Sequence, residues 1–108
     1  MENLGKNEDL NQLLQSSPVC ILQFGDDGCM PCHVIRKKPE VWLKDHPQVT
    51  ARYVNAADHL ELASRMNVFN VPAVYVFAEG KPALEQAGYF SVLELLEKTE
   101  RLIRLLGS

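Results

Sequence analysis

Short apolar runs alternate along the chain with segments whose apolar residues recur at helical spacing. Three runs rich in β-branched and aromatic residues predict strands, and they cover Val19–Phe24, Val49–Val54 and Ala73–Phe77. The turn-forming residues at Glu79–Pro82 follow the third run and predict a hairpin that leads to a fourth strand, Leu84–Ala87. We therefore expect the last two strands to be neighbours in one sheet.

Segments of helical periodicity lie before and between these strands. The first helix is predicted by leucines at helical spacing, Leu10, Leu13 and Leu14. Ser16-Ser17-Pro18 should end that helix, and a longer helix is expected over His33–Lys44. Pro39 lies inside the longer helix and should kink it or break its hydrogen-bond ladder, because proline has no backbone N–H.

Two capping boxes mark the starts of two more helices. Asp58 with Glu61 predicts a helix that runs through Met66, and Ser91 with Glu94 predicts the last helix of the chain. The last helix has an apolar stripe formed by Val92, Leu95, Leu96, Thr99, Leu102, Ile103 and Leu106. Such a stripe can bind a partner, but packing against a sheet is its more common use, and we expect that use here.

The order of these elements indicates the fold class. Helices alternate with strands through most of the chain, and a hairpin and a helix close it. We therefore predict an α/β fold in which a central mixed β-sheet is flanked by helices on both faces. The 108 residues contain no linker, repeat or low-complexity stretch, so we expect residues 1–108 to form a single domain.

Composition and charge narrow the function classes. The apolar content of 46% is ordinary for a globular protein, and the formal net charge of −3 argues against nucleic-acid binding through a basic patch. No apolar run approaches the roughly 18 residues that span a membrane, and the polar segment Met1–Asp9 has no signal-peptide core. We expect a cytoplasmic monomer that binds neither nucleic acid nor a membrane.

The segment Cys29-Met30-Pro31-Cys32 carries the clearest chemistry. It lies between a predicted strand and a predicted helix, where two thiols three positions apart form a reversible dithiol–disulfide couple. Unpaired N–H groups and the dipole at a helix N-terminus favour a thiolate and can lower a cysteine pKa from about 8.5 toward about 7. We therefore expect Cys29 to be the nucleophile and Cys32 to resolve the mixed disulfide.

Structural roles for the cysteine pair are disfavoured by the rest of the chain. A structural zinc site usually needs four ligands, and the histidines at 33, 46 and 59 follow no ligand spacing with the pair, so we expect no metal. A purely structural disulfide with so short a loop would be unusual in a chain without other bridges. Cys20 falls among apolar residues of a predicted strand, where we expect a buried small hydrophobe without a chemical role.

Further residues follow a pattern known from one protein family. They are Phe24 five residues before Cys29, the segment Val68-Phe69-Asn70-Val71-Pro72-Ala73 before a predicted strand, Glu79-Gly80 at the hairpin, and Gly88. With these features the chain resembles the thioredoxin family from about Asn7 to Leu106. The resemblance implies a thioredoxin-like fold with a cis proline at Pro72 beside the dithiol, and it implies that Val71 offers its backbone to an extended substrate peptide.

Some positions depart from the usual pattern of that family. Gly28 stands where a tryptophan usually precedes the first cysteine, and the one tryptophan of the chain is Trp42. Gln23 stands where the family has a buried acidic residue, and an amide cannot be the general base that helps Cys32 to ionise. His33 follows the second cysteine where a lysine is common, and the family's first strand is missing or reduced to a few residues before Lys6.

Polar residues beside the motif are candidate modulators of the pair. Asp26 and Asp27 either form a solvated acidic loop, which we favour, or lie close enough to disfavour the Cys29 thiolate. His33 is expected to point to solvent, although an imidazole near Cys32 could relay a proton at neutral pH.

Taken with the resemblance, these residues predict an enzyme, a thiol–disulfide oxidoreductase that exchanges electrons with protein disulfides through Cys29 and Cys32. Its expected partners are protein disulfide substrates and a reductase that donates electrons, and no cofactor is expected. The alternative is a non-catalytic or regulatory module that binds a protein partner through the groove at Pro72. The intact cysteine pair favours the enzyme, and the changes at Gly28 and Gln23 keep the alternative open.

Overall fold

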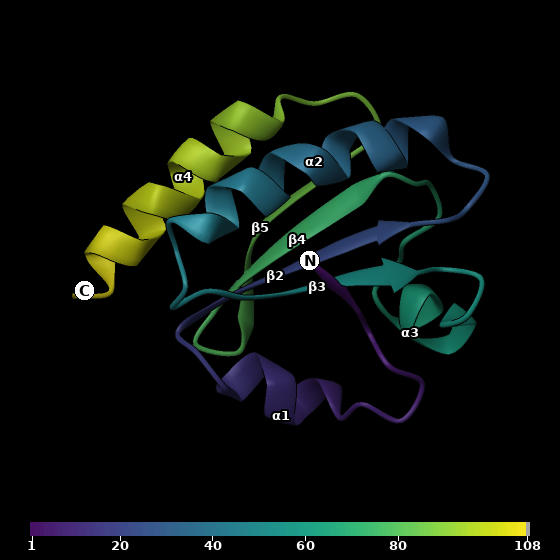
Figure 1. The fold of residues 1–108 in the computed structure, drawn as a ribbon. Coiled ribbons are helices and arrows are strands. Elements are labelled where there is room, and N and C mark those ends of the chain that lie inside the picture. Colours follow the sequence, from purple (N-terminus) through teal and green to yellow (C-terminus); the bar gives the residue numbers. More distant parts are fainter. Residues whose placement is uncertain (108) are drawn as a thin grey trace.

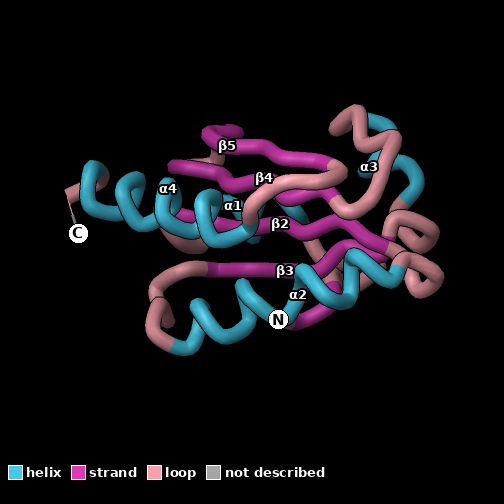
Figure 2. Tube along the Cα trace, turned by 90° about the horizontal axis from the view of Figure 1, so that it is seen from above, coloured by secondary structure: helices cyan, strands magenta, loops and turns pink. Residues whose placement is uncertain are grey.

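A five-stranded sheet lies at the centre of the structure, a computed structural model that describes residues 1–107 (Figure 1). The strands are β1 (Glu2–Asn3), β2 (Val19–Gly25), β3 (Thr50–Asn55), β4 (Ala73–Ala78) and β5 (Lys81–Ala87). Their order across the sheet is β1-β3-β2-β4-β5, so β1 and β5 are its outer strands (Figure 2). The pairs β1–β3 and β2–β3 are parallel and the other two are antiparallel, which confirms the predicted mixed sheet.

Four helices cover the two faces of this sheet. They are α1 (Leu10–Gln15), α2 (Met30–Lys44), α3 (Leu60–Arg65) and α4 (Val92–Leu105). Helices α2 and α4 lie on one face, and α1 and α3 lie on the other (Figure 1). The arrangement confirms the predicted α/β class, with helices on both faces.

Two apolar clusters form the core, one on each face of the sheet. Side chains alternate between the faces along a strand, and β2 supplies both clusters because it is the central strand. Leu22 and Phe24 pack in the cluster that also holds buried residues of α1 and α3. Val19 and Ile21 pack in the cluster with Leu95 and other residues of α4. By the same alternation, Gln23 points toward the face that α2 and α4 cover.

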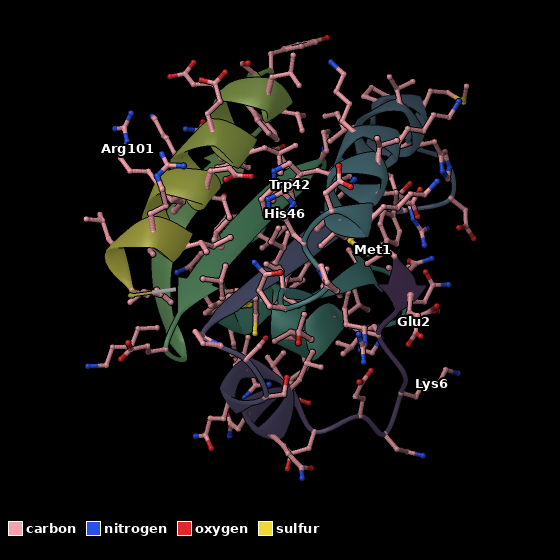
Figure 3. All side chains as sticks on the ribbon, turned by 60° about the vertical axis from the view of Figure 1, so that its left-hand side comes forward. Met1, Glu2, Lys6, Trp42, His46 and Arg101 are labelled. Carbon is pink, nitrogen blue, oxygen red and sulfur yellow. A yellow bond between two sulfur atoms is a disulfide. The ribbon has the colours of Figure 1, made fainter. Side chains whose placement is uncertain are left out.

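The far end of α2 is joined to α4 by an aromatic and polar contact. Trp42 stacks on His46 with ring centroids 3.7 Å apart and an interplanar angle of 10° (Figure 3). His46 Nδ1 lies 2.7 Å from the Trp42 carbonyl oxygen, and its Nε2 contacts a carboxylate oxygen of Glu100 on α4. This contact fixes α2 against α4 at the end opposite to the cysteines.

The chain has a short strand β1, which pairs Glu2 and Asn3 with β3, in agreement with the expectation of a first strand reduced to a few residues before Lys6. The structure corrects two other element boundaries. Helix α2 begins at Met30, earlier than the predicted His33, and it continues past the buried Pro39, whose nitrogen cannot donate to the hydrogen-bond ladder. Strand β5 begins at Lys81, earlier than the predicted Leu84.

The capping box predicted at Asp58 is wrong. The N-cap of α3 is His59, and its side chain makes no capping hydrogen bond within the described chain. Asn55 organises this turn instead, because its side-chain oxygen accepts the Ala57 N–H at 3.0 Å and its carbonyl oxygen accepts the Asp58 N–H at 3.1 Å. At α4, the Ser91 side chain accepts the N–H of Glu94 at 3.1 Å, which confirms the cap predicted there.

Over residues 1–107, the helices are too short or too polar to cross a membrane.

Candidate active site

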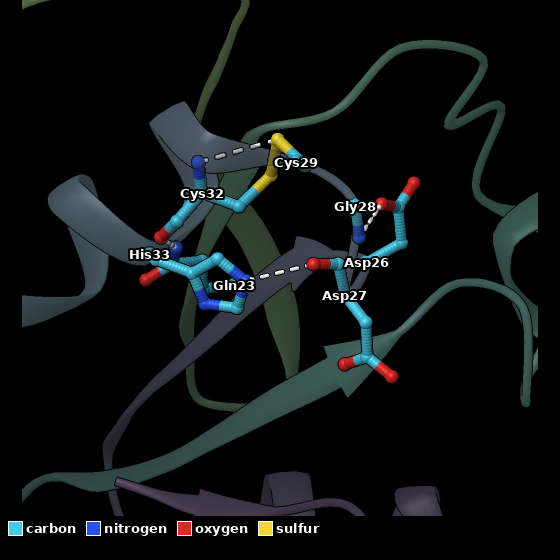
Figure 4. The surroundings of a disulfide bond; sticks show 7 residues. All are labelled: Gln23, Asp26, Asp27, Gly28, Cys29, Cys32 and His33. Carbon is cyan, nitrogen blue, oxygen red and sulfur yellow. Dashed lines mark hydrogen bonds between the residues drawn. A yellow bond between two sulfur atoms is a disulfide. The ribbon is translucent and has the colours of Figure 1, made fainter.

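The loop after β2 places the first cysteine at the start of α2. The Asp26 side chain accepts the N–H of Gly28 at 2.9 Å, and the Asp26 carbonyl oxygen accepts the N–H of Cys29 at 3.2 Å (Figure 4). Cys29 has extended backbone angles and is the N-cap of α2, and Pro31 lies in the first turn, where its missing N–H costs little. Cys29 therefore lies just outside the helix, at its N-terminus.

Cys29 and Cys32 form a disulfide, with their Cα atoms 5.3 Å apart. The backbone N–H of Cys32 also points at the Cys29 sulfur, 3.2 Å from it (Figure 4). Cys29 is half-buried, whereas Cys32 is 0% exposed. Cys29 is therefore the more exposed cysteine of the pair, and Cys32 is the buried one. An N–H donor aimed at the Cys29 sulfur would also stabilise a thiolate there.

Gln23 lies beneath Cys32, at the position that the family resemblance indicated. It is 0% exposed, and its Nε2 donates a hydrogen bond to the Cys32 carbonyl oxygen at 3.0 Å. This bond ties the central strand to the first turn of α2. A glutamine has no proton to exchange near neutral pH, so Gln23 acts here as a fixed donor.

The candidate modulators Asp27 and His33 contact each other through the loop. The Nε2 atom of His33 lies 3.1 Å from the Asp27 carbonyl oxygen (Figure 4). The Asp27 side chain accepts a hydrogen bond from the Asn55 side chain at 3.4 Å, and Asp26 is held by Gly28. These polar groups thus stabilise the loop before α2. Their influence on the reactivity of the pair remains a prediction.

The segment before β4 lies at the same end of the sheet as the cysteine loop. Phe24 at the end of β2 pairs with Ala73, and the Val71–Pro72 peptide bond just before it is cis, the isomer that the resemblance implied. The Pro72 carbonyl oxygen accepts the N–H of Gly88 at 2.9 Å. Pro72 is buried and Val71 is half-buried. That Val71 and Pro72 bind substrate remains a prediction.

Sequence reasoning did not identify two residues beside Cys32, Tyr53 and Gly25. Tyr53 is 3% exposed, and the parallel register of β2 and β3 pairs it with Gln23. A Cβ atom added to Gly25 would overlap the Tyr53 hydroxyl and lie 2.9 Å from the Cys32 Cβ. The available signal was a glycine ending a buried strand, since glycine there often marks the close approach of another group.

Burial raises the pKa of the Tyr53 phenol above its ordinary value of 10.0. The Arg36 guanidinium opposes this increase in pKa, and the carboxylates of Asp26 and Asp27 add to it. Tyr53 is therefore protonated at neutral pH and is a hydrogen-bond donor.

Among residues 1–107, no three or more histidine, cysteine, aspartate or glutamate side chains are grouped so that they could hold a metal ion.

Comparison with known proteins gives one family. Residues 3–100 match the family described as Thioredoxin. The thioredoxin-like protein YdfQ of Bacillus subtilis is 32% identical over 105 residues, which are 97% of this chain and 94% of that protein. A thioredoxin of Mycoplasmoides gallisepticum is 26% identical over 97 residues, which are 90% of this chain and 97% of that protein.

Solved structures show the same fold. A mutant thioredoxin from Halobacterium salinarum has a TM-score of 0.81 at 24% identity and covers 94% of this chain and 88% of its own. A thioredoxin from Plasmodium falciparum has a TM-score of 0.82 at 17% identity, with 94% and 98% covered. With a family match over most of its length and a redox-type cysteine pair at the start of α2, the chain belongs to the thioredoxin family.

Proposed function

We propose that this protein is a thiol–disulfide oxidoreductase that exchanges electrons with protein disulfides through Cys29 and Cys32. The observation that carries the proposal is the disulfide at the N-terminus of α2, with a half-buried Cys29 above a fully buried Cys32. This difference in exposure supports the two roles that we propose. Cys29 meets the substrate, and Cys32 acts only after a mixed disulfide has formed.

The reaction starts from the reduced pair. The Cys29 thiolate attacks one sulfur of a substrate disulfide, an S–S bond forms to Cys29, and the other substrate sulfur leaves as a thiolate that takes up a proton. Cys32 then loses its proton and attacks the Cys29 sulfur, which releases the second substrate thiolate. The pair ends as a disulfide after giving two electrons to the substrate. A cytoplasmic reductase would return it to the dithiol form.

Exposed apolar side chains at the same end of the sheet as the pair support a protein substrate. Met30 lies between the cysteines in sequence and is 71% exposed, and Phe69 lies three residues before Pro72 and is 79% exposed. Tyr89 is fully exposed and follows the glycine whose N–H bonds the Pro72 carbonyl oxygen. Exposed large apolar groups beside a reactive centre favour the binding of another polypeptide.

The test is reduction of insulin disulfides with dithiothreitol as the electron donor, followed by turbidity. We expect the wild-type chain to accelerate the reaction and Cys29→Ser to abolish the acceleration. Cys20→Ala is the matched control, because Cys20 is buried against backbone carbonyls of α1 and should not exchange electrons. Cys32→Ser should accumulate a mixed disulfide between Cys29 and an insulin chain, detectable by mass spectrometry.

Each result has a defined meaning. A wild-type chain without activity would contradict the proposal and favour a binding module with the same fold. Full activity of Cys29→Ser would also contradict it, because no other thiol of the chain has comparable exposure. Loss of activity in Cys20→Ala alone would move the chemistry away from the helix N-terminus.

A further inference from the structure

Two buried polar atoms beneath Cys32 have no hydrogen-bond partner within residues 1–107. They are the side-chain oxygen of Gln23 and the hydroxyl of Tyr53. Buried polar groups in native proteins are nearly always paired, so an unpaired one calls for an explanation, and a role in redox or catalytic chemistry is one such explanation. Both atoms belong to strands β2 and β3, on the sheet face that α2 covers.

Gly25 shows where the Tyr53 hydroxyl lies. A Cβ atom on Gly25 would overlap the hydroxyl oxygen, and it would lie 2.8 Å from Tyr53 Cζ and 2.9 Å from the Cys32 Cβ. The phenol therefore occupies the place that a side chain on Gly25 would fill. The missing side chain brings the hydroxyl next to the first turn of α2, beside the carbon that bears the Cys32 sulfur.

The Tyr53 ring is held firmly in this place. The Arg36 guanidinium of α2 lies over it, with the guanidinium carbon 4.2 Å from the ring centroid. The charged groups that act on the phenol are Arg36 from α2 and Asp26 and Asp27 from the loop before it. Tyr53 is thus positioned by packing and by a cation–π contact, and its hydroxyl is left free to bond another group.

We propose that the Tyr53 hydroxyl donates a hydrogen bond to the Cys32 thiolate in the reduced protein and in the mixed disulfide. In the disulfide form, the Cys32 sulfur is bonded to Cys29 and carries no charge, and the hydroxyl has no hydrogen-bond partner among the described residues. Once that bond breaks, the Cys32 sulfur can turn toward the phenol. The inference rests on the dithiol chemistry proposed above and adds Tyr53 to its catalytic residues.

The hydrogen bond would replace a general base by a fixed donor. Tyr53 keeps its own proton throughout. The proton of the Cys32 thiol passes to solvent or to the departing substrate thiolate, the Cys32 thiolate forms the new S–S bond, and the hydrogen bond from Tyr53 is released. Tyr53 lowers the free energy of the thiolate that attacks, and Gln23 holds the backbone of the same residue through its carbonyl oxygen.

The test is the ionisation of Cys32 in the reduced protein, followed by the carbon-13 resonance of its Cβ as pH is raised. Tyr53→Phe keeps the ring beneath Arg36 and removes only the hydroxyl. We expect it to raise the pKa of Cys32 by about one, a tenfold fall in the ionisation constant, because a hydrogen bond to a charged group is lost. Tyr75→Phe is the control, since that hydroxyl donates to the Met66 carbonyl oxygen at 2.8 Å.

A second measurement uses the unmodified protein. The carbon-13 resonance of Tyr53 Cζ should shift in the reduced protein with the same pKa as Cys32, and it should show no such step in the disulfide form. An unchanged Cys32 pKa in a folded Tyr53→Phe, or a Tyr53 resonance that ignores the Cys32 titration, would overturn the inference. Neither readout depends on turnover, so failure of the insulin assay would contradict the proposed function without deciding the role of Tyr53.

Discussion

Replacing Gln23 by glutamate should make the stability of the protein strongly dependent on pH. The two side chains have nearly the same shape, so the substitution changes chemistry and leaves packing almost intact. Gln23 is 0% exposed and donates from Nε2 to the Cys32 carbonyl oxygen at 3.0 Å. A protonated glutamate can still donate to that oxygen, whereas a carboxylate cannot and would be buried without a cationic partner bound to it.

The expected magnitude follows from proton linkage. Burial disfavours the charged form, so the pKa of Glu at position 23 should be higher in the folded state than its unfolded value of about 4.3. For an acid whose folded pKa is raised, the penalty is absent below the unfolded pKa and grows by about 1.4 kcal/mol per pH unit until the folded pKa is reached. Between about pH 4.5 and about pH 7 the variant should therefore lose up to about 3 kcal/mol relative to wild type.

Urea unfolding of the disulfide form, followed by circular dichroism at several pH values, measures this difference. Working with the disulfide form keeps Cys29 and Cys32 from titrating. Gln48→Glu is the control, because Gln48 is exposed on the loop after α2, and its difference from wild type should stay small and nearly flat with pH. A penalty for Gln23→Glu that is the same at low and neutral pH would refute the reasoning, since it would mean that the carboxylate is solvated where the glutamine is buried.

Three further substitutions test other parts of the structure. Gly25→Ala should destabilise the protein by about 1–3 kcal/mol in urea unfolding, because the added carbon would overlap the side chains of Tyr53 and Cys32. Gly28→Ala is the control, because its added carbon meets only one atom at ordinary contact distance, and it should unfold near the wild-type midpoint. Glu8→Gln should cost at most about 1 kcal/mol at neutral pH. The hydrogen bond from Arg52 lowers the pKa of Glu8 below its usual 4.5. The stabilisation from this ion pair is therefore present above pH 4.5, and it should vanish as the pH falls through the lower pKa of the folded state. A difference between Glu8→Gln and wild type that persists in acid would contradict the ion pair. Ser91→Ala should cost about 0.5–2 kcal/mol in thermal unfolding through loss of the α4 cap, and Ser91→Asp should recover most of it.

The larger elements could be predicted because each one buries apolar residues that recur at a regular spacing. The strands β2, β3 and β4 and the stripe of α4 were recognisable from the spacing of apolar residues alone, and the alternation of helices with strands predicted a mixed sheet covered on both faces. Helix ends were less predictable where more than one nearby polar residue could form the turn. The start of α3 depends on a turn organised by Asn55, and Asp58 has the right residue type in the wrong place.

The cysteine pair and the residues beneath it also differ in how well the sequence predicts them. Cys29 and Cys32 could be assigned from sequence because their spacing and the helix start are local, and a family resemblance indicated Gln23 as the residue beneath them. Tyr53 lies far from the motif in sequence, and it comes near Cys32 only through the register of β2 with β3. That register follows from which strands pair and how they align, and a single sequence does not show either.

The outer strands of the sheet bear on whether copies of the protein can join edge to edge. An edge strand with free backbone groups is a template on which another chain can pair. At one edge, β1 offers two residues, and at the other, β5 begins with Lys81 and Pro82 and pairs with β4 through an irregularity near Phe77. Short strands, charges, prolines and bulges all discourage such pairing. The proposed making and breaking of the disulfide at one end of the sheet would therefore take place on a scaffold whose two edges discourage pairing with another chain.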